Sequence, residues 1–178
     1  EKFNIKVCVI NFQHQNSNSI LLEKAIRLYE KKIKNIAKKI NNTGSPYGYV
    51  SMGSAIVCTA GVYISIGGMP KKNATEDFYF LQALAKHTKI HKINKILVFP
   101  SSRCEQRVYL GTGYRMQEFQ EKREFSNLDY STEAYENLKK IIIISEDMWG
   151  QDYNFIFNKI KLKYNKEAVN FLLKNNFK

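Results

Sequence analysis

The stretch GSPYGYVSMGSAIVCTAGVYISIGGMP, residues 44–70, separates two pairs of regular elements in the chain. Before it, residues 3–12 are rich in β-branched and aromatic side chains that partly alternate, which predicts a strand. Residues 19–40 carry apolar side chains at steps of three and four, which predicts an amphipathic helix. After it, the patterns predict a helix over 75–87 and a strand over 92–99. Strands and helices alternate, so the fold class is expected to be α/β.

The stretch 44–70 itself contains six of the nine glycines of the chain. Its small residues surround a short apolar run at 55–58, which is expected to form a strand or a short helix. Because glycine lets backbone approach a ligand closely, the composition indicates the wall of a cleft. It is equally compatible with a series of tight turns.

The remainder of the chain has a different character. Residues 100–115, PSSRCEQRVYLGTGYR, form a predicted irregular loop whose length is typical of functional segments. Residues 131–148 and 152–176 predict two or three helices, and Ile141–Ile144 is assigned to a helix because TEAYENLKK precedes it. We therefore expect one domain over residues 1–116 and a helical extension packed on it over 117–178.

The net charge of +12 raises the question of a nucleic-acid partner. The basic residues are mainly lysines scattered along the chain, without the arginine forks or basic-aromatic alternation of nucleic-acid sites. We therefore expect no nucleic-acid partner, although a diffuse attraction to anionic lipid would allow peripheral membrane contact. No apolar run is long enough to predict a membrane helix. The oligomeric state stays open.

The cysteines and histidines predict no metal site. Cys8, Cys58 and Cys104 are odd in number and widely spaced, so neither a zinc knuckle nor a redox pair is indicated. Cys8 and Cys58 lie in apolar runs and are expected to be buried, which fits a reducing, cytoplasmic setting. His87 and His91 are four residues apart, but the helix is expected to end between them and no third ligand is evident.

Glu76 and Asp77 open the helix predicted over 75–87, directly after its expected N-cap, Thr75. A carboxylate in the first helical turn is stabilised by the helix dipole, and this structural role accounts for the pair on local grounds. At the rim of a cleft, one carboxylate would instead take a proton from a bound hydroxyl. The local sequence leaves both roles open.

Two of the five arginines, Arg103 and Arg107, lie in loop 100–115 shortly before Gly111 and Gly113. Guanidinium groups bind phosphate oxygens at two points, and a Gly-Thr-Gly turn can direct backbone N–H groups toward an anion. The loop is therefore interpreted either as facing a phosphate or as an ordinary surface turn.

Taken in order, these motifs resemble the family-two inverting glycosyltransferases, which have the GT-A fold. The similar residues are GSPYGYVSMGSAIVCTAGVYISIGGMPKKNATEDFYFLQALAK at 44–86 and VFPSSRCEQRVYLGTG at 98–113, about a third of the chain. The resemblance implies that Asp77, with Glu76 beside it, is the general base that acts on the acceptor hydroxyl. It also implies that Gly67 and Gly68 lie where the acceptor and donor sugars meet.

The resemblance assigns further positions to the donor. Gly53 and Ser54 would lie beneath the donor sugar, and Arg103 and Arg107 would lie on a loop that closes over the donor diphosphate. The loop continues to Gly111 and Gly113. Its residues RCEQRVY do not reproduce the Gln-x-x-Arg-Trp pattern of the family.

One departure from the family is large. GT-A enzymes bind the nucleotide on an N-terminal Rossmann-like half and hold Mg²⁺ or Mn²⁺ through an Asp-x-Asp motif. The aspartates of this chain, at positions 77, 129, 147 and 152, form no such motif. The resemblance therefore implies the C-terminal, acceptor-side part of a GT-A domain, with the metal expected only in the full-length enzyme and the isolated chain inactive.

The function expected from the sequence is transfer of a sugar from a nucleotide-sugar donor to an acceptor hydroxyl, with inversion and with Asp77 as base. The alternative is a non-catalytic binding or scaffold domain, either a degenerate transferase remnant or a basic module for an anionic partner. The nucleotide, the sugar and the acceptor are not specified by the sequence.

Overall fold

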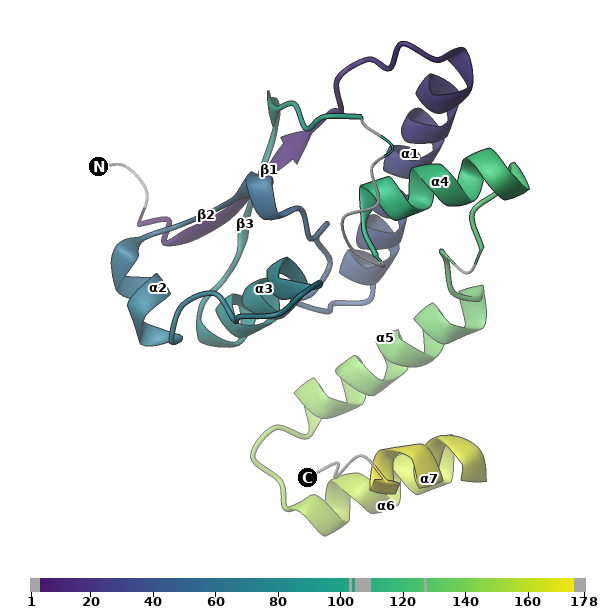
Figure 1. The fold of residues 1–178 in the computed structure, drawn as a ribbon. Coiled ribbons are helices and arrows are strands. Elements are labelled where there is room, and N and C mark those ends of the chain that lie inside the picture. Colours follow the sequence, from purple (N-terminus) through teal and green to yellow (C-terminus); the bar gives the residue numbers. More distant parts are fainter. Residues whose placement is uncertain (1–3, 103, 105–109, 127, 175–178) are drawn as a thin grey trace. The chain divides into compact units, whose positions relative to one another are not determined.

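The computed structural model describes residues 4–102, 104, 110–126 and 128–174, which form a mixed α/β structure (Figure 1). The chain divides into two compact units, one of residues 1–41 and 46–130 and the other of residues 42–45 and 131–178. The boundary predicted after residue 116 falls inside helix α4 (Thr112–Lys122), which belongs to the first unit.

The sheet of the first unit has three strands with β1 (Val7–Phe12) at its centre. Strand β2 (Ile56–Cys58) pairs with β1 in antiparallel fashion, and β3 (His91–Val98) pairs with it in parallel fashion. The strands predicted at the start of the chain and over 92–99 are thus confirmed, and the short apolar run supplies β2. The sheet is mixed rather than parallel throughout.

The pairing of β1 with β3 is irregular near its end, and this irregularity positions His14. The register shifts on both sides of Asn11, so that Phe12 comes to lie opposite Val98. Beyond the strands, the backbone N–H of Gln13 donates to the carbonyl of Val98 at 3.1 Å, and that of Gln15 donates to Pro100 at 2.8 Å. A bulge of this kind redirects side chains beside functional sites.

Two helices cover one part of the sheet. Helices α2 (Ala60–Ser65) and α3 (Glu76–His87) pack with β1 in an apolar cluster of Val7, Val62, Phe80, Leu81 and Leu84. The stretch 44–70 contains a short 3₁₀ turn, η1 (Gly53–Ala55), followed by β2 and α2. It therefore forms both a strand and a short helix.

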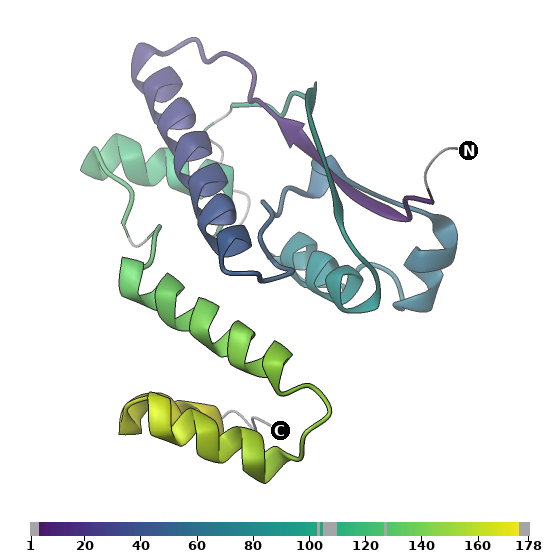
Figure 2. The same cartoon turned by 180° about the vertical axis from the view of Figure 1, so that it is seen from behind.

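Helix α1 (Ile20–Asn42) packs against α4, and the two lie together in both views of the fold (Figure 2). Their shared core contains Ala25 and Ile26 from α1, Met116 and Phe119 from α4, and Phe125. The N-terminal half of the apolar stripe predicted for 19–40 forms this contact. The start of α4 at Thr112 shortens the irregular segment that the sequence predicted.

The second unit contains α5 (Thr132–Asp147), α6 (Tyr153–Lys163) and α7 (Lys166–Lys174). Two of these helices begin with a side-chain cap: Ser131 Oγ accepts from Ala134 N at 3.2 Å, and Asp152 Oδ1 accepts from Asn154 N at 2.8 Å. Ile141–Ile144 is helical, as predicted. Within the described part of the chain, no helix has the length and apolar character needed to cross a membrane.

Candidate functional site

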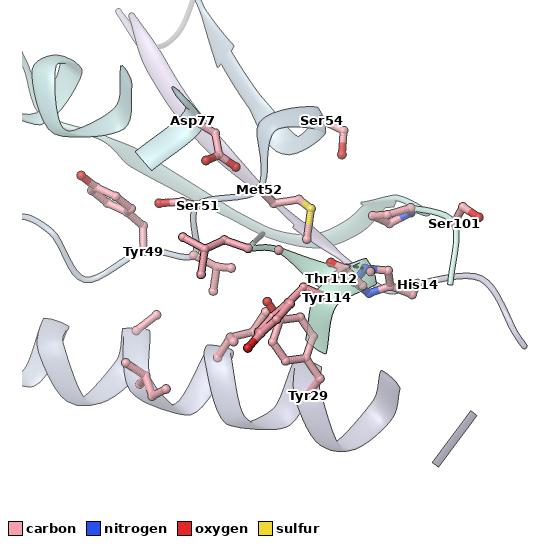
Figure 3. A pocket seen from close by; sticks show the side chains of 18 of the residues that line it. His14, Tyr29, Tyr49, Ser51, Met52, Ser54, Asp77, Ser101, Thr112 and Tyr114 are labelled. Atoms are coloured by element: carbon pink, nitrogen blue, oxygen red, sulfur yellow. Dashed lines mark hydrogen bonds between the residues drawn. The ribbon is translucent and has the colours of Figure 1, made fainter. Parts of the chain in front are cut away.

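A pocket of about 670 Å³ lies in the first unit, between α1, the first turn of α3 and the first turn of α4 (Figure 3). Residues 49–52 and 54 of the glycine-rich stretch form part of its wall, together with Pro100 and Ser101. The stretch 44–70 thus forms part of a cleft wall, one of the two interpretations that its composition allowed, although none of its six glycines is a lining residue. None of the described lining residues is a lysine or an arginine, in contrast to the basic character of the whole chain.

Asp77 lies half-buried at this pocket, and Glu76 lines it as well. Burial raises the pKa of the Asp77 carboxyl, and the charge of Glu76 raises it further, whereas the backbone N–H groups of Phe78 and Gly53 act in the opposite direction. The Phe78 N–H donates to Asp77 Oδ1 at 2.7 Å. No described lysine or arginine forms an ion pair with Asp77, so its charge is stabilised by backbone alone.

Thr75 occupies the N-cap position of α3, but it does not act as the predicted side-chain cap. Its φ is 64° and its ψ is 14°, a left-handed conformation that is rare for a β-branched residue. Its hydroxyl donates to the carbonyl of Ala74 at 2.5 Å instead of accepting from the helix. Backbone strain of this kind clusters at functional sites, and here it directly precedes Glu76 and Asp77.

The glycines of the predicted site have separate roles. A side chain at Gly53 would meet Asp77 Oδ2 at 3.8 Å, so this glycine packs closely behind the carboxylate, and Ser54 lines the pocket. Gly67 and Gly68, expected where two sugars meet, are not among its lining residues. Both have positive φ, and a side chain at Gly68 would meet the Tyr63 ring at 3.0 Å, which accounts for that glycine by packing.

Gly111 and Gly113, at the end of the predicted loop 100–115, also line the pocket. Gly111 has a φ of 100° and directly precedes α4, so the turn places Thr112 and Tyr114 at the pocket. Arg103 and Arg107, expected to bind a diphosphate, lie outside the described residues. The structure thus brings Asp77, Glu76, Ser54, Gly111 and Gly113 to one cavity.

Several lining residues did not stand out in the sequence. Tyr29, Tyr49 and Tyr114 line the pocket, and they come from α1, the glycine-rich stretch and α4 (Figure 3). Burial raises the pKa of the Tyr29 hydroxyl, the charge of Arg115 lowers it, the charge of Asp77 raises it, and the hydrogen bond with Thr112 lowers it.

His14 is the other missed residue, and only 2% of its surface is exposed although it lines the pocket. Its Nδ1 lies 2.7 Å from Glu30 Oε1, and its backbone N–H donates to the same oxygen. Arg27 donates to the His14 carbonyl at 2.9 Å and lies 3.4 Å from Glu30 Oε2. The carboxylate of Glu30 is therefore compensated on both oxygens.

The protonation state of His14 follows from these contacts. Burial lowers the pKa of the imidazole, while the hydrogen bond to Glu30 and its charge oppose this, and the charges of Arg27 and Lys34 lower it again. A neutral ring that donates from Nδ1 to Glu30 leaves Nε2 as an acceptor. Nε2 lies 3.5 Å from Thr112 Oγ1 (Figure 3).

A signal for part of this arrangement was present in the sequence. Glu30 lies four residues after Ile26 and three before Ile33, so it interrupts the apolar stripe of α1. A carboxylate on a buried helical face needs a partner, and His14 and Arg27 supply it. His14 itself lies in a polar loop and carries no such signal.

The described residues do not fit a resident metal ion. No group of three or more His, Cys, Asp or Glu side chains in the described part of the chain could hold one. His87 ends α3 and lies 3.1 Å from Ser65 Oγ, whereas His91 begins β3, so the two histidines do not share a helix face. Cys8, Cys58 and Cys104 are free thiols, with Cys8 buried.

Comparison of the chain with protein-family models, with curated proteins and with solved structures finds no match.

Proposed function

We propose that the pocket binds the acceptor of a sugar-transfer reaction and that Asp77 is the general base. On this proposal the chain is the acceptor-side part of an inverting, family-two glycosyltransferase of the GT-A fold. The observation that carries the proposal is a half-buried carboxylate of raised pKa at the wall of a pocket, without an ion-pair partner among the described residues. Such a group accepts a proton more readily than an ordinary aspartate.

The proposed step is a direct displacement. The acceptor hydroxyl transfers its proton to the Asp77 carboxylate while its oxygen forms a bond to the anomeric carbon of the donor sugar. The bond between that carbon and the nucleotide diphosphate breaks, and its electron pair leaves with the phosphate oxygen. Attack from the face opposite the leaving group inverts the anomeric centre.

The surroundings of Asp77 support this role over that of a helix cap. The cap position before it is strained rather than capped, since Thr75 is left-handed and its hydroxyl is turned to Ala74. Gly53 lies directly behind the carboxylate, and Ser54 lies on the same wall. Glu76 contributes by its charge, which raises the pKa of Asp77.

The test uses the protein in the form that its gene encodes, with a panel of nucleotide-sugars, Mg²⁺ or Mn²⁺, and uncharged sugar acceptors. Nucleotide diphosphate release that depends on the acceptor is the readout. Asp77→Asn is expected to lower it by roughly 10²-fold to 10⁴-fold, the usual contribution of a general base, without loss of folding or donor binding.

The matched control is Asp152→Asn, which makes the same chemical change at the N-cap of α6 in the second unit. This variant is expected to retain full turnover. Unchanged turnover in Asp77→Asn would refute the assignment of the base. Absence of transfer with every donor would favour a non-catalytic binding domain.

A further inference from the structure

The second wall of the pocket contains an ordered chain of polar groups that the proposed reaction does not use. Glu30 and His14 are almost completely buried, with exposures of 6% and 2%, and Thr112 is half-buried at the pocket. The groups come from α1, from the loop after β1 and from the first turn of α4. Three separate elements thus converge on one line of contacts.

This line has a direction. The Glu30 carboxylate can only accept, so it fixes the proton of His14 on Nδ1, at 2.7 Å. The unprotonated Nε2 then accepts from the Thr112 hydroxyl, which lies 3.5 Å away. Because the single proton of Thr112 is directed to His14, the two lone pairs of its oxygen are left as acceptors, one for the neighbouring Tyr29 hydroxyl and one for a ligand in the pocket.

The charge of the pocket narrows the ligand class. Asp77 and Glu76 are the acidic residues of the lining, and no described lining residue is a lysine or an arginine. Among the described lining residues, both carboxylates would repel an anionic group and no cation would compensate for this repulsion. A neutral molecule that donates hydrogen bonds from hydroxyl groups suits both the Asp77 wall and the Thr112 wall.

The apolar part of the lining fits the same class. Tyr29 and Tyr114 lie beside Thr112 in Figure 3, and Tyr49 lies toward Asp77. Aromatic rings present a flat apolar face with a polar edge, which suits a molecule that carries both C–H and O–H groups. A polyhydroxylated ring has this combination of surfaces.

We propose that Thr112, through the chain His14–Glu30 behind it, binds a hydroxyl group of an uncharged sugar or polyol at the wall of the pocket away from Asp77. Thr112 and His14 form the binding site, and Glu30 is a positioning residue that holds the His14 tautomer. The inference rests on the proposed function only in taking this pocket as the acceptor site. It adds the chemical class of the acceptor and a second point of attachment.

The experiment follows the three histidine rings by NMR in protein labelled with ¹⁵N-histidine, without donor or metal, so that no transfer is required. His87 and His91 serve as internal references. In the free protein His14 is expected to be protonated at Nδ1 and not at Nε2. Titration with glucose, cellobiose or lactose is expected to shift the His14 Nε2 resonance saturably, and titration with glucuronate at least about tenfold less tightly.

Variants of Thr112 connect the shift to the hydroxyl. Thr112→Val is expected to weaken sugar binding by about tenfold, the effect of one lost hydrogen bond, and Thr112→Ser to restore it. Glu30→Gln is expected to change the His14 tautomer populations, a readout that loss of stability alone would not move. The Ser variant and the tautomer of the unmodified protein keep the test decisive if Thr112→Val folds poorly.

Three results would overturn the proposal: a His14 protonated at Nε2, equal or tighter binding of glucuronate, and no saturable shift with any neutral sugar. This inference and the proposed reaction can fail separately. Asp77→Asn is expected to abolish transfer while the sugar-dependent shift of His14 remains. Loss of the His14 shift without loss of transfer would refute only the proposed binding of a hydroxyl group by Thr112 and His14.

Discussion

The two carboxylates associated with the pocket, Glu30 and Asp77, are treated by the fold in opposite ways. Glu30 is buried, and both its oxygens have partners in His14 and Arg27. Asp77 is half-buried, and the Phe78 N–H is its main partner. The charge of Glu30 is compensated by contacts within the fold, whereas the charge of Asp77 remains available to a ligand.

The largest expected effect is the loss of stability when Glu30, the buried carboxylate, is replaced. Glu30→Gln removes the charge that compensates Arg27 and the acceptor that orients His14, so the free energy of unfolding should fall by about 2–4 kcal/mol. Chemical denaturation measures it. Glu118→Gln is the matched control, since Glu118 is equally buried and lies 2.6 Å from Arg115 but is not at the pocket. Both variants should be destabilised, and only Glu30→Gln should disturb the His14 ring. A wild-type denaturation midpoint for Glu30→Gln would contradict the comparison.

The intermediate effect concerns the pH dependence of stability. His14 has a folded-state pKa below its ordinary value of 6.5, because burial disfavours the charged ring and the nearby Arg27 and Lys34 add to this. Between the two pKa values the unfolded chain binds more protons, so the free energy of unfolding should fall as the pH is lowered below 6.5. One proton accounts for at most about 1.4 kcal/mol per pH unit.

The measurement is a series of denaturation curves from about pH 7.5 to pH 5. His14→Gln should flatten the curve in this window, whereas His91→Gln should leave it unchanged. If both variants retain the wild-type slope, the ring of His14 is not held neutral by the fold.

The smallest expected effect is on the Asp77 side and has the opposite sign. A folded-state pKa above the ordinary value means that the ionised form of Asp77 is less favourable in the folded protein than in the unfolded chain. The stabilisation by the protonated carboxyl is therefore present below pH 3.8 and is lost as the pH rises through the folded pKa. Asp77→Asn should therefore raise the free energy of unfolding at pH 7 by a few tenths to about 1 kcal/mol. Asp152→Asn should change the free energy of unfolding little, since aspartate and asparagine are similarly good N-cap residues. A clear loss of stability in Asp77→Asn would assign the carboxylate to structure instead.

The regular elements of the fold were largely predictable from local pattern. Alternation and three-four spacing are properties of short segments, and they located β1, α1, α3 and β3 to within a few residues. The Thr75 cap was wrong because the backbone there is left-handed, which a Thr-Glu-Asp sequence does not encode. The start of α4 was missed because Gly-Thr-Gly is compatible with both a turn and a helix beginning after its first glycine.

The candidate site was predictable on one wall only. Glu76 and Asp77 are adjacent in the chain and Ser54 lies in the glycine-rich stretch before them, and their residue types indicate acid-base chemistry in a small-residue cleft. The other wall joins His14, Glu30 and Thr112, whose contacts depend on how β1 pairs with β3 and how α1 packs on α4. Such pairings are set by tertiary structure, and the only local signal for them is Glu30, a carboxylate in the apolar stripe of α1.

The mixed pairing of β1 also has a consequence for the order in which the protein folds. β1 is made well before β3, and its parallel partner is not complete until Val98 has been synthesised, since Phe12 pairs with Val98. The central strand therefore stays unpaired on that side while α1, α2 and α3 emerge from the ribosome. Long-range pairing of this kind slows folding and leaves a strand edge open to other chains meanwhile. The His14 wall of the pocket depends on this late event, because it brings the segment of His14 beside the segment of Pro100.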